Sequence, residues 1–548
     1  MVNRVNDYLW DYSELRPDER QIRRQHEIPK CHDFRTDFSR DRDRIMFSRA
    51  FRRLGGKTQI FLANYHDHAR NRLTHSLEVS KIARTICKCF NLDVDLAEAI
   101  ALGHDLGHPP FGHSGEEALS MIMNGCIPIN GVTLSFPHLG FKHNLQSVRI
   151  AVDLERSLNR NRGLNITNFT LYGIANHTDS IFNKCRIKKR FDENGQKIDS
   201  PEAENFCKIG DKCFKEDKIP YWRSTSFYKI YRDSMRLKDS DKKSWSFESF
   251  IVAFSDEIAQ RQHDIEDALE VKIITVDQVI DILDKCFANI IRDDPINRNN
   301  FDQIIENKHR NDLTSDINRF IFNLYLSDLI RNVYQRLSSK FSGDKSEWAE
   351  IKSHLTVKEA KSLIAYSEEF RDADKKFHEF LRDRIVQSSE VQRMDGIGIY
   401  IIKHLFEAYL ANPLQLPDKT IVQLYKTCKF DVVDKMYEET KDSYKDKYLS
   451  NYKDLIKIQY QKKFDETLSR KIDDWLLPDF FIHDSELIPK VVGNLRNLLI
   501  TDQTDNNFKP FLMRTICDYI SGMTDSYAIN EFHNLYGHKC LQIKMNIK

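Results

Sequence analysis

The sequence predicts an all-α protein, and three observations support that fold class. Glycine and proline contribute only 19 and 14 of the 548 residues, about half of their usual share, so few residues interrupt helices. From Ser246 onward, apolar residues recur mainly at helical spacing within lysine-rich segments of mixed charge. Hydrophobic residues make up 41% of the chain, which is enough for a substantial buried core.

Charge and cysteine content narrow the class of protein further. The chain has 83 Lys and Arg against 82 Asp and Glu, which argues against wholesale disorder and against a globally basic nucleic-acid coat. Its 11 cysteines, irregularly spaced, indicate reduced thiols and no disulfide framework. The N-terminal segment lacks the apolar core of a secretory signal, and no stretch approaches the roughly 18 apolar residues of a membrane helix. We therefore expect a soluble, cytoplasmic protein with no membrane partner.

Changes in composition divide the chain into four regions. Residues 1–40 form a charged N-terminal arm. Residues 41–270 contain most of the glycine and proline residues and a histidine-rich stretch. Within that second region, residues near 181–245 have the weak periodicity and basic character of an insertion. Residues 271–510 are a helical region that we expect to offer oligomer contacts, and residues 511–548 form a C-terminal helical segment.

The first two helices predicted in the histidine-rich region carry inward-facing histidines. A helix over 73–90 places His75 on its apolar face. The next, over 92–106, stacks Leu96, Ile100 and His104 at successive i,i+4 steps. We expect it to end at Gly107, since glycine suits a C-cap and the prolines that follow disfavour helix.

Two further helices are predicted on either side of the insertion. One begins at Ser114, where Ser114-Gly-Glu-Glu117 matches a capping box. The other covers 248–269 and carries four residues along one side: Val252, Asp256, Ala259 and His263. Asp256 therefore joins the inward-facing polar residues.

Inward-facing histidines and an aspartate on three helices need compensation, because a buried unpaired carboxylate costs several kcal/mol. A divalent cation bound by four residues would supply it: His75, His104, Asp105 and Asp256. Adjacent helical residues diverge by about 100°, so His104 and Asp105 can share an ion only at the helix flank. Such a mixed set of ligands suits Mn, Fe, Zn or Mg, with open positions for water and phosphate.

The His-Asp dipeptide alone carries little information, because it occurs five times, at 32–33, 66–67, 104–105, 263–264 and 483–484. A solvated or capping pair is the ordinary interpretation of the other four. The pair at 104–105 differs in its context, GHDLGHPPFGHSGE, which places three histidines, an aspartate and a glutamate around a helix break. Reactive groups often gather on such loops.

Six sequence blocks, in order, resemble those of the bacterial deoxyguanosinetriphosphate triphosphohydrolases, members of the HD superfamily of metal phosphohydrolases. The blocks are RDRDRIMFSRAFRRLGGKTQIF (40–61), RNRLTHSLEVSKIAR (70–84), LGHDLGHPPFGHSGEEAL (102–119), FKHNLQSVRI (141–150), FSDEIAQRQHDIEDAL (254–269) and CDYISGMTDSYAI (517–529). The resemblance implies an HD-domain helical core within 41–270, to which the segment 511–548 returns. It also implies hydrolysis of deoxynucleoside triphosphates, dGTP first, to deoxynucleoside and tripolyphosphate. Implied partners are further copies of the chain, as a homo-oligomer, and single-stranded DNA as an effector.

Position by position, the resemblance implies two functional groups of residues. The metal ligands would be His75, His104, Asp105 and Asp256. The cation would be Mn²⁺ or Mg²⁺ first, with Fe, Zn or Co as alternatives. His113 and Glu116 match the catalytic His-Glu pair of the family, although an acidic residue in a first helical turn also stabilises the helix dipole with no catalytic role.

The resemblance also implies five substrate-binding positions: Arg72 on the triphosphate, Gln59 near the sugar 3′-hydroxyl, polar positions His108 and His143, and Tyr527 on the nucleotide. Each has a plainer alternative. Arg72 can pair with an acidic neighbour, Gln59 can be a polar loop residue, and Tyr527 can be a core or capping aromatic.

Two positions depart from the family pattern. Gln260 stands where relatives often have a tyrosine beside the sugar, and Lys142 replaces an acidic residue. The first affects sugar discrimination and the second affects local electrostatics. Two other function classes stay open: another HD phosphohydrolase, such as a nucleotide phosphodiesterase or guanosine-polyphosphate hydrolase, and a non-catalytic nucleotide sensor. The KTQ and FGHSGE blocks favour the triphosphohydrolase, and the complete set of ligands argues against an inactive site.

Overall fold

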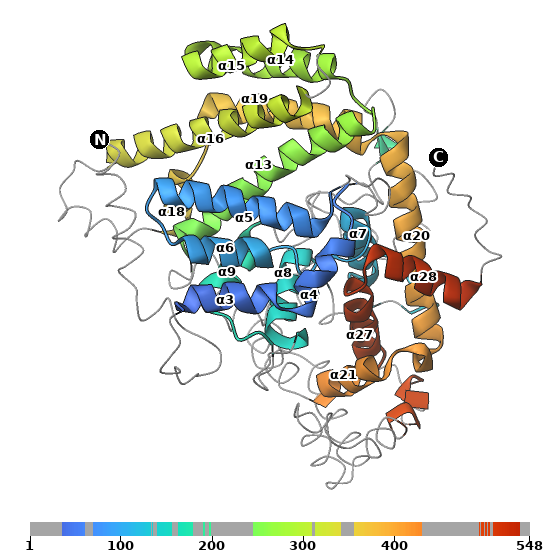
Figure 1. Cartoon of the computed structure of the whole chain (residues 1–548). Helices are drawn as coiled ribbons and strands as arrows, with labels where there is room; N and C mark the ends of the chain where they lie inside the picture. The colour runs from blue at the N-terminus through green and yellow to red at the C-terminus, as the bar shows by residue number, and fades with distance from the viewer. Residues whose placement is uncertain are drawn as a thin grey trace.

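The computed structural model describes residues 35–60, 70–132, 134, 140–155, 163–178, 190–191, 197–198, 245–309, 313–340, 356–429, 493, 495–497, 499–500, 502–504 and 508–537. Helices dominate these residues, which confirms the predicted all-α class (Figure 1). The described strands, β1 (Arg190–Phe191) and β2 (Lys197–Ile198), form one short antiparallel pair inside the region predicted as an insertion. No helix of the described residues is long and apolar enough to cross a membrane.

The helices of the first half surround the histidine-rich segment. They are α3 (Asp37–Met46), α4 (Arg49–Arg53), α5 (Arg72–Cys89), α6 (Val94–Gly103), α7 (Gly112–Met123), α8 (His143–Arg149), α9 (Asn168–Asn176) and α13 (Phe247–Glu270). The short helices η1 (Leu54–Gly56) and η2 (Ile150–Leu154) follow α4 and α8.

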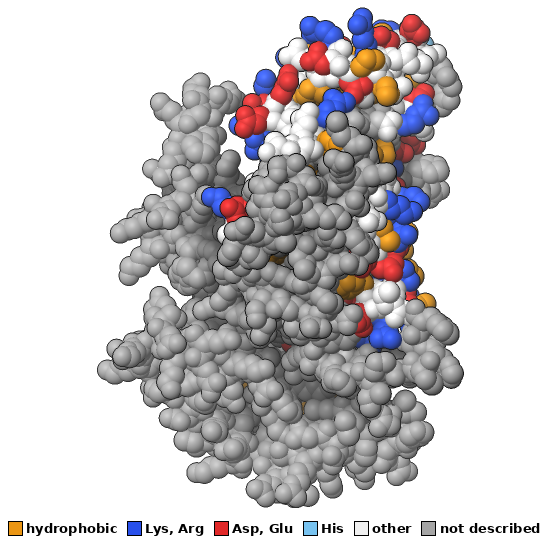
Figure 2. Space-filling view, turned by 90° about the vertical axis from the view of Figure 1, so that its left-hand side faces the viewer, with side chains coloured by type: hydrophobic (Ala, Val, Ile, Leu, Met, Phe, Trp, Pro, Cys, Tyr) orange, Lys and Arg blue, Asp and Glu red, His pale blue; other side chains and the backbone are white. Residues whose placement is uncertain are grey.

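The helices of the second half extend and cover this region. They are α14 (Val276–Asp293), α15 (Pro295–Glu306), α16 (Leu313–Lys340), α18 (Val357–Leu363), α19 (Glu368–Leu381), η5 (Arg382–Val386), α20 (Ser389–Ala411), η6 (Pro413–Gln415), α21 (Asp418–Lys429), α27 (Lys509–Ser521) and α28 (Asp525–Tyr536). On the face shown in Figure 2, Lys and Arg side chains lie among Asp and Glu over the described part of the surface.

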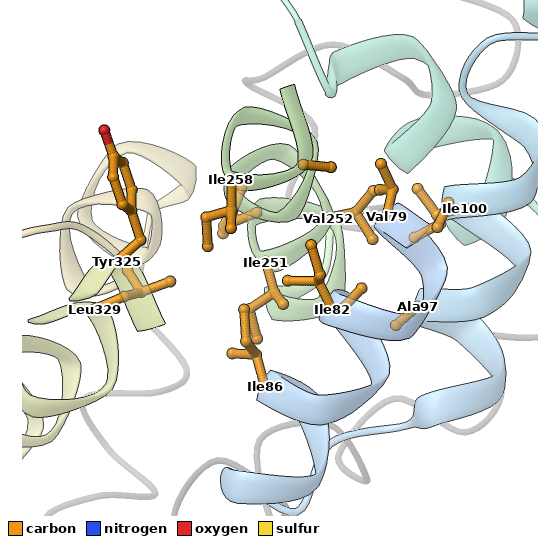
Figure 3. Packing of buried hydrophobic residues seen from close by; sticks show 14 of the residues in the cluster. Val79, Ile82, Ile86, Ala97, Ile100, Ile251, Val252, Ile258, Tyr325 and Leu329 are labelled. Carbon is orange, nitrogen blue, oxygen red and sulfur yellow. The ribbon is translucent and has the colours of Figure 1, made fainter. Parts of the chain in front are cut away.

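Two hydrophobic cores hold the helices together. The first core lies between the helices α5, α6, α9, α13, α14, α15, α16, α18 and α19. Residues such as Val79, Ile100, Ile251 and Leu329 interlock there (Figure 3). The helix α13 passes between α5 and α16 and contacts both (Figure 1). The second core joins α7 to α20, α21, α27 and α28, around residues such as Phe406. Of the two C-terminal helices, α27 packs against α7 and α28 packs against α20.

Local sequence and tertiary packing together set the helix ends around the site. Asn71 caps α5 and Ser246 caps α13, so both helices begin close to their predicted starts. The predicted capping box at Ser114 is wrong, because α7 begins two residues earlier, at Gly112. The N-cap residue is Phe111, which has a left-handed φ of 64° and forms no side-chain capping hydrogen bond. The turn after α6 presses against α8, where a Cβ on Gly107 would collide with the backbone of His143 and Ser147.

Candidate active site

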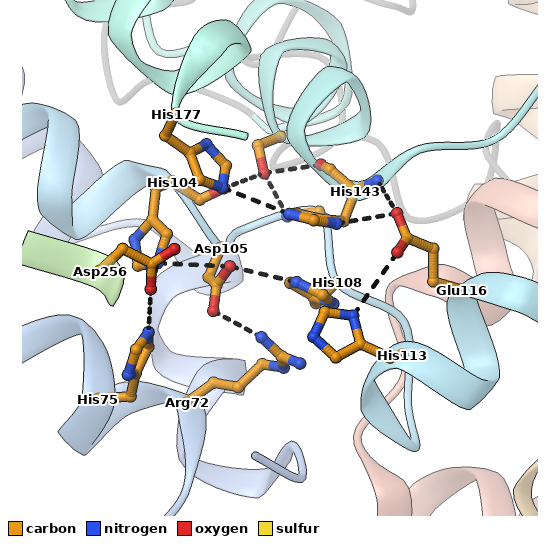
Figure 4. A network of polar contacts seen from close by, with 12 residues as sticks. Arg72, His75, His104, Asp105, His108, His113, Glu116, His143, His177 and Asp256 are labelled. Atoms are coloured by element: carbon orange, nitrogen blue, oxygen red, sulfur yellow. Dashed lines mark hydrogen bonds and ion pairs between the residues drawn. The ribbon is translucent and has the colours of Figure 1, made fainter. Parts of the chain in front are cut away.

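The structure brings the four predicted metal ligands together at the ends and faces of three helices (Figure 4). His75 lies on α5, Asp256 lies on α13, and His104 caps the C-terminus of α6, directly before Asp105. The Oδ1 atom of Asp256 is 2.9 Å from Nε2 of His75 and 3.7 Å from Nε2 of His104. The Oδ1 atom of Asp105 is 3.4 Å from the same His104 nitrogen.

The donor set fits a divalent cation. Nδ1 of His104 donates to the carbonyl of Ala101 at 2.6 Å, which leaves the lone pair of Nε2 free. That Nε2 atom is buried and has no hydrogen-bond partner among the described residues. One nitrogen each from His75 and His104 and one oxygen of Asp256 lie within 4.8 Å of one another, as ligands of one ion would.

The charged groups of this cluster shift one another's pKa values. Although burial opposes it, the carboxylates of Asp105 and Asp256 raise the pKa of His104 to about 9. Burial would raise the pKa of Asp105, but His104, His108 and Arg72 hold it well below its ordinary value. A bound cation would take the place of the proton on His104, since a histidine ligand must be neutral.

Arg72 lies beside the metal ligands and has unused hydrogen-bonding capacity. Its Nη1 atom is 2.6 Å from Oδ2 of Asp105, so the acidic neighbour considered from the sequence is present. Its Nε and Nη2 atoms are buried without a partner among the described residues. Two nitrogen atoms without partners, which carry three N–H groups, suit an anionic ligand such as phosphate.

Gln59 and Arg72 approach each other at Gly112. A Cβ atom at Gly112 would lie 3.3 Å from Nη2 of Arg72 and 3.6 Å from the backbone oxygen of Gln59. The side-chain Oε1 of Gln59 is also buried without a partner within the described part of the chain. Glycine therefore leaves room beside the unpaired Nη2 of Arg72 and the backbone of Gln59.

The His113–Glu116 pair is close to the metal cluster. Nδ1 of His113 is 3.7 Å from Oε2 of Glu116, and 64% of the His113 side chain is exposed. Glu116 is buried, and its Oε1 accepts from both the backbone N and Nδ1 of His143 at 2.8 Å. Burial would raise the pKa of Glu116, but His143 and Lys142 hold it well below its ordinary value.

His108 connects the two groups. Its Nε2 atom lies 3.2 Å from Oδ1 of Asp105, and its ring stacks on His143 with centroids 3.7 Å apart. The ring of His113 is 5.3 Å away. His108 and His143, the polar positions predicted to bind substrate, therefore lie in one continuous network with the predicted ligands and the His-Glu pair (Figure 4).

Lys142, one of the two departures from the family pattern, lies near the buried glutamate. Its Nζ is 3.5 Å from Oε1 of Glu116. The expected effect on local electrostatics is thus an effect on Glu116 itself. The other departure, Gln260, lies partly buried on α13 one turn after Asp256.

Two histidines that the sequence analysis did not select also line the cluster. His177, the C-cap of α9, lies with its ring centroid 5.0 Å from that of His104 and its Nε2 3.3 Å from Nε2 of His143. Burial, and then the charges of His104 and His143, lower its pKa to about 3. The Nδ1 atom of His263 lies 3.1 Å from Nδ1 of His75. His177 follows the apolar helix α9, as His104 follows α6, and His263 lies on the same side of its predicted helix as Asp256, so these two patterns were the available signals.

Tyr527 lies apart from this network. It is on α28, and its hydroxyl is 3.1 Å from the hydroxyl of Tyr519 on α27. None of the hydrogen bonds or ring contacts within the described residues joins it to the histidines. Its assignment to the nucleotide stays a prediction.

The C-terminal helices hold the segments that carry the site. Asp525, buried at the start of α28, accepts hydrogen bonds from the backbone N of Thr58 at 2.7 Å and of Phe111 at 2.9 Å, and from the Thr58 hydroxyl. Lys57, fully buried, donates to the carbonyl oxygens of Ser521, at 2.9 Å, and of His108. These hydrogen bonds join the loop after η1 and the turn before α7 to the end of α27 and the start of α28.

Replacing Asp525 by alanine is expected to lower the free energy of unfolding by about 2–5 kcal/mol, because buried donors on Thr58 and Phe111 would lose their acceptor. Urea denaturation measures this change. Asp277→Ala is the matched control, because Asp277 is exposed and forms a surface pair with Lys308, which is worth about 1 kcal/mol or less. Equal losses in the two variants would contradict the assignment.

Comparison with known proteins places this site in a class. The HD domain family matches residues 72–212, and the phosphohydrolase-associated domain family matches residues 364–430 and 485–534. The chain is therefore an HD-domain phosphohydrolase.

Relatives in three bacteria define the family more closely. Each is described as a deoxyguanosinetriphosphate triphosphohydrolase-like protein. The relative from Roseobacter denitrificans is 33% identical over 70% of this chain and 81% of its own length. The relative from Pelagibacter ubique is 34% identical over 68% and 82%, and that from Bordetella pertussis is 30% identical over 76% and 88%. The chain belongs to the family of deoxyguanosinetriphosphate triphosphohydrolase-like proteins, as the six sequence blocks predicted.

Proposed function

We propose that the protein hydrolyses deoxynucleoside triphosphates, dGTP preferred, to the deoxynucleoside and inorganic tripolyphosphate. One observation carries this proposal: a cation-competent set of ligands, a guanidinium with unused donors, and the exposed His113 with its buried partner Glu116 form one continuous network. A triphosphate presents the negative charge that such a site attracts.

His75, His104, Asp105 and Asp256 would hold the divalent cation, Mn²⁺ or Mg²⁺ first, with Fe, Zn or Co as alternatives. When bound, such an ion polarises a phosphoryl oxygen and makes water a better nucleophile near neutral pH. The chain itself supplies the rest. The free N–H groups of Arg72 would bind phosphate oxygens and hold the triphosphate in line for attack.

His113 would move the proton, either from the attacking water or to the departing 5′-oxygen. Its exposed position leaves the ring accessible to substrate, while Glu116 lies 3.7 Å away and would orient it. The hydrogen bonds from His143 fix the Glu116 carboxylate. Glu116 therefore acts through His113, as a buried carboxylate acts behind the histidine of a hydrolytic triad.

Product analysis tests the proposal directly. Incubation of the purified protein with dGTP and Mn²⁺ or Mg²⁺ should yield deoxyguanosine and tripolyphosphate in equal amounts. Orthophosphate or pyrophosphate would identify another HD phosphohydrolase instead. Nucleotide binding without turnover would identify a sensor.

We further propose a cytoplasmic homo-oligomer whose contacts come from residues 271–510, with single-stranded DNA as an effector. The family resemblance supports these proposals. Mass measurement in solution and dGTP turnover with and without single-stranded DNA test them.

Sugar discrimination gives a prediction about the two glutamines. If Gln59 binds the 3′-hydroxyl, a nearby 2′-hydroxyl is excluded by crowding, and a pocket that only crowds a hydroxyl discriminates by about 10²-fold. We expect dGTP to be preferred over GTP, Gln260→Tyr to sharpen the preference, and Gln59→Ala to weaken dGTP use by about 10-fold. The measurement is kcat/KM for both nucleotides in the three proteins. Unchanged ratios would mean that neither glutamine contacts the sugar.

A further inference from the structure

The histidine of the His-Asp pair at 263–264 contacts a predicted metal ligand, which the dipeptide alone does not indicate. His263 lies on α13, two turns after Asp256, and is 1% exposed. Its Nδ1 atom is 3.1 Å from Nδ1 of His75, with the two rings edge to face. Its other nitrogen, Nε2, contacts the carboxylate of Glu78 on α5. His263 therefore lies between a predicted metal ligand and an acid.

The hydrogen-bonding requirements of these groups define where the protons lie. The Glu78 carboxylate can only accept, so Nε2 of His263 carries a hydrogen and donates to it. In a neutral imidazole the other nitrogen then accepts, so Nδ1 of His263 accepts a hydrogen from Nδ1 of His75. In this tautomer Nε2 of His75 carries the lone pair, although it lies 2.9 Å from Oδ1 of Asp256. Two acceptor atoms repel each other at that distance, so this is the tautomer that the proposed cation requires, whereas without the ion Nε2 carries the hydrogen and donates it to Asp256.

We infer that Glu78 and His263 form a relay that fixes the tautomer of His75 and keeps its Nε2 available to the divalent cation. The inference rests on the proposed metal site and adds two positioning residues to it. Histidine ligands commonly donate their second N–H to a carboxylate, directly or through a neighbour, and this partner orients the ring. Here an imidazole stands between ligand and carboxylate.

The acid at the end of the relay is itself held in place. Arg70, directly before α5, lies with its Nε 3.4 Å from Oε2 of Glu78, and it also pairs with Asp267 on α13 at 3.2 Å. The relay therefore joins α5 and α13, the two helices that carry His75 and Asp256. Glu78 is 44% exposed at its side chain, so it can be replaced without opening the first core.

The affinity of the metal-free, full-length protein for Mn²⁺ tests the relay without reference to turnover. His263→Ala and His263→Phe should weaken Mn²⁺ binding by about 10–100-fold, the usual effect of removing such a partner. His263→Asn should bind more tightly than either, because its Oδ1 can still accept from His75. If the phenylalanine variant binds Mn²⁺ as the wild type does, His263 only fills space and the relay is wrong. An asparagine variant no better than phenylalanine would also overturn it.

Glu78→Ala extends the test to a site where folding is not at risk. It should weaken Mn²⁺ binding by about 10-fold, and an unchanged affinity overturns the relay even if the His263 variants do not fold. Glu98→Ala is the control: Glu98 is a partly exposed acid on α6 that pairs with Arg84, and its loss should leave affinity unchanged. His104→Ala separates the two proposals. If it binds Mn²⁺ as the wild type does, the metal site itself is wrong. If it loses the ion while the relay variants keep it, only the relay fails.

Discussion

Alanine at His104 or at Asp105 should abolish turnover, by about 10³-fold or more, and should strip the protein of its divalent cation. The reason lies in the ligand set: Nε2 of His104 is buried with no other partner, and Asp105 supplies an oxygen 3.4 Å from it. A cation that polarises phosphate contributes several kcal/mol to transition-state stabilisation, and each 1.4 kcal/mol corresponds to about a tenfold change in rate.

Metal content by elemental analysis and dGTP turnover measure the two effects together. The His-Asp dipeptide at 483–484 would offer a control histidine, His483, but it lies outside the described residues. His404→Ala is used instead, because His404 on α20 donates to the carbonyl of Tyr400 and its ring contacts Phe532 of the second core, away from the predicted ligands. It should retain both metal and activity. Normal metal content and rate in His104→Ala and Asp105→Ala would remove the proposed site.

Alanine at His113 should lower kcat by about 10²–10⁴-fold, the usual contribution of a general acid or base. Metal content and KM should stay close to those of the wild type. The structure gives the physical reason. His113 is exposed, and its carboxylate partner is Glu116, which is not one of the predicted metal ligands. The change should therefore remove proton transfer alone.

Two outcomes would contradict this role. Loss of the metal in His113→Ala would make His113 a ligand, and an unchanged kcat would leave the proton to another group, with His108 the nearest imidazole at 5.3 Å. Glu116→Gln provides a companion measurement. It should lower kcat in the same direction, because Glu116 acts through His113.

The sequence predicted most closely those helices whose apolar faces are continuous. The predicted helix over 248–269 is observed as α13 (Phe247–Glu270), since residues such as Ile251, Val252 and Ile258 repeat at helical spacing into the first core. Predicted and observed ends differ more where distant segments intervene. The helix expected over 92–106 ends at Gly103, and the turn that follows packs against α8.

The start of α7 shows why a local signal can mislead. Ser114 and Glu117 have the spacing of a capping box, but Ser114 instead donates to the carbonyl of Phe111. The backbone N of Phe111 finds its acceptor in Asp525, far along the chain. A partner that distant in sequence satisfies the helix start in place of the local cap, and no short motif reveals it.

The candidate site was predictable in the same uneven way. The six blocks pointed to residues that the fold does bring together, including His108 and His143. His177 and His263 belong to the same network, but only the packing of α9 and α13 places them beside His104 and His75. The role of each stays a prediction until the variants are measured, as do the four regional boundaries.

The two hydrophobic cores have a consequence for control of the reaction. The predicted ligands lie on α5, α6 and α13 of the first core, whereas His113 lies on α7, which packs against α20 and α27 in the second. The distance between His113 and the predicted ligands therefore depends on how the two cores pack against each other, and contacts such as Arg149 to Asp518 at 2.6 Å join them. We therefore expect a molecule or a neighbouring copy that displaces α20 or α27 to move His113 relative to the predicted ligands, and so to change kcat more than the affinity for the cation.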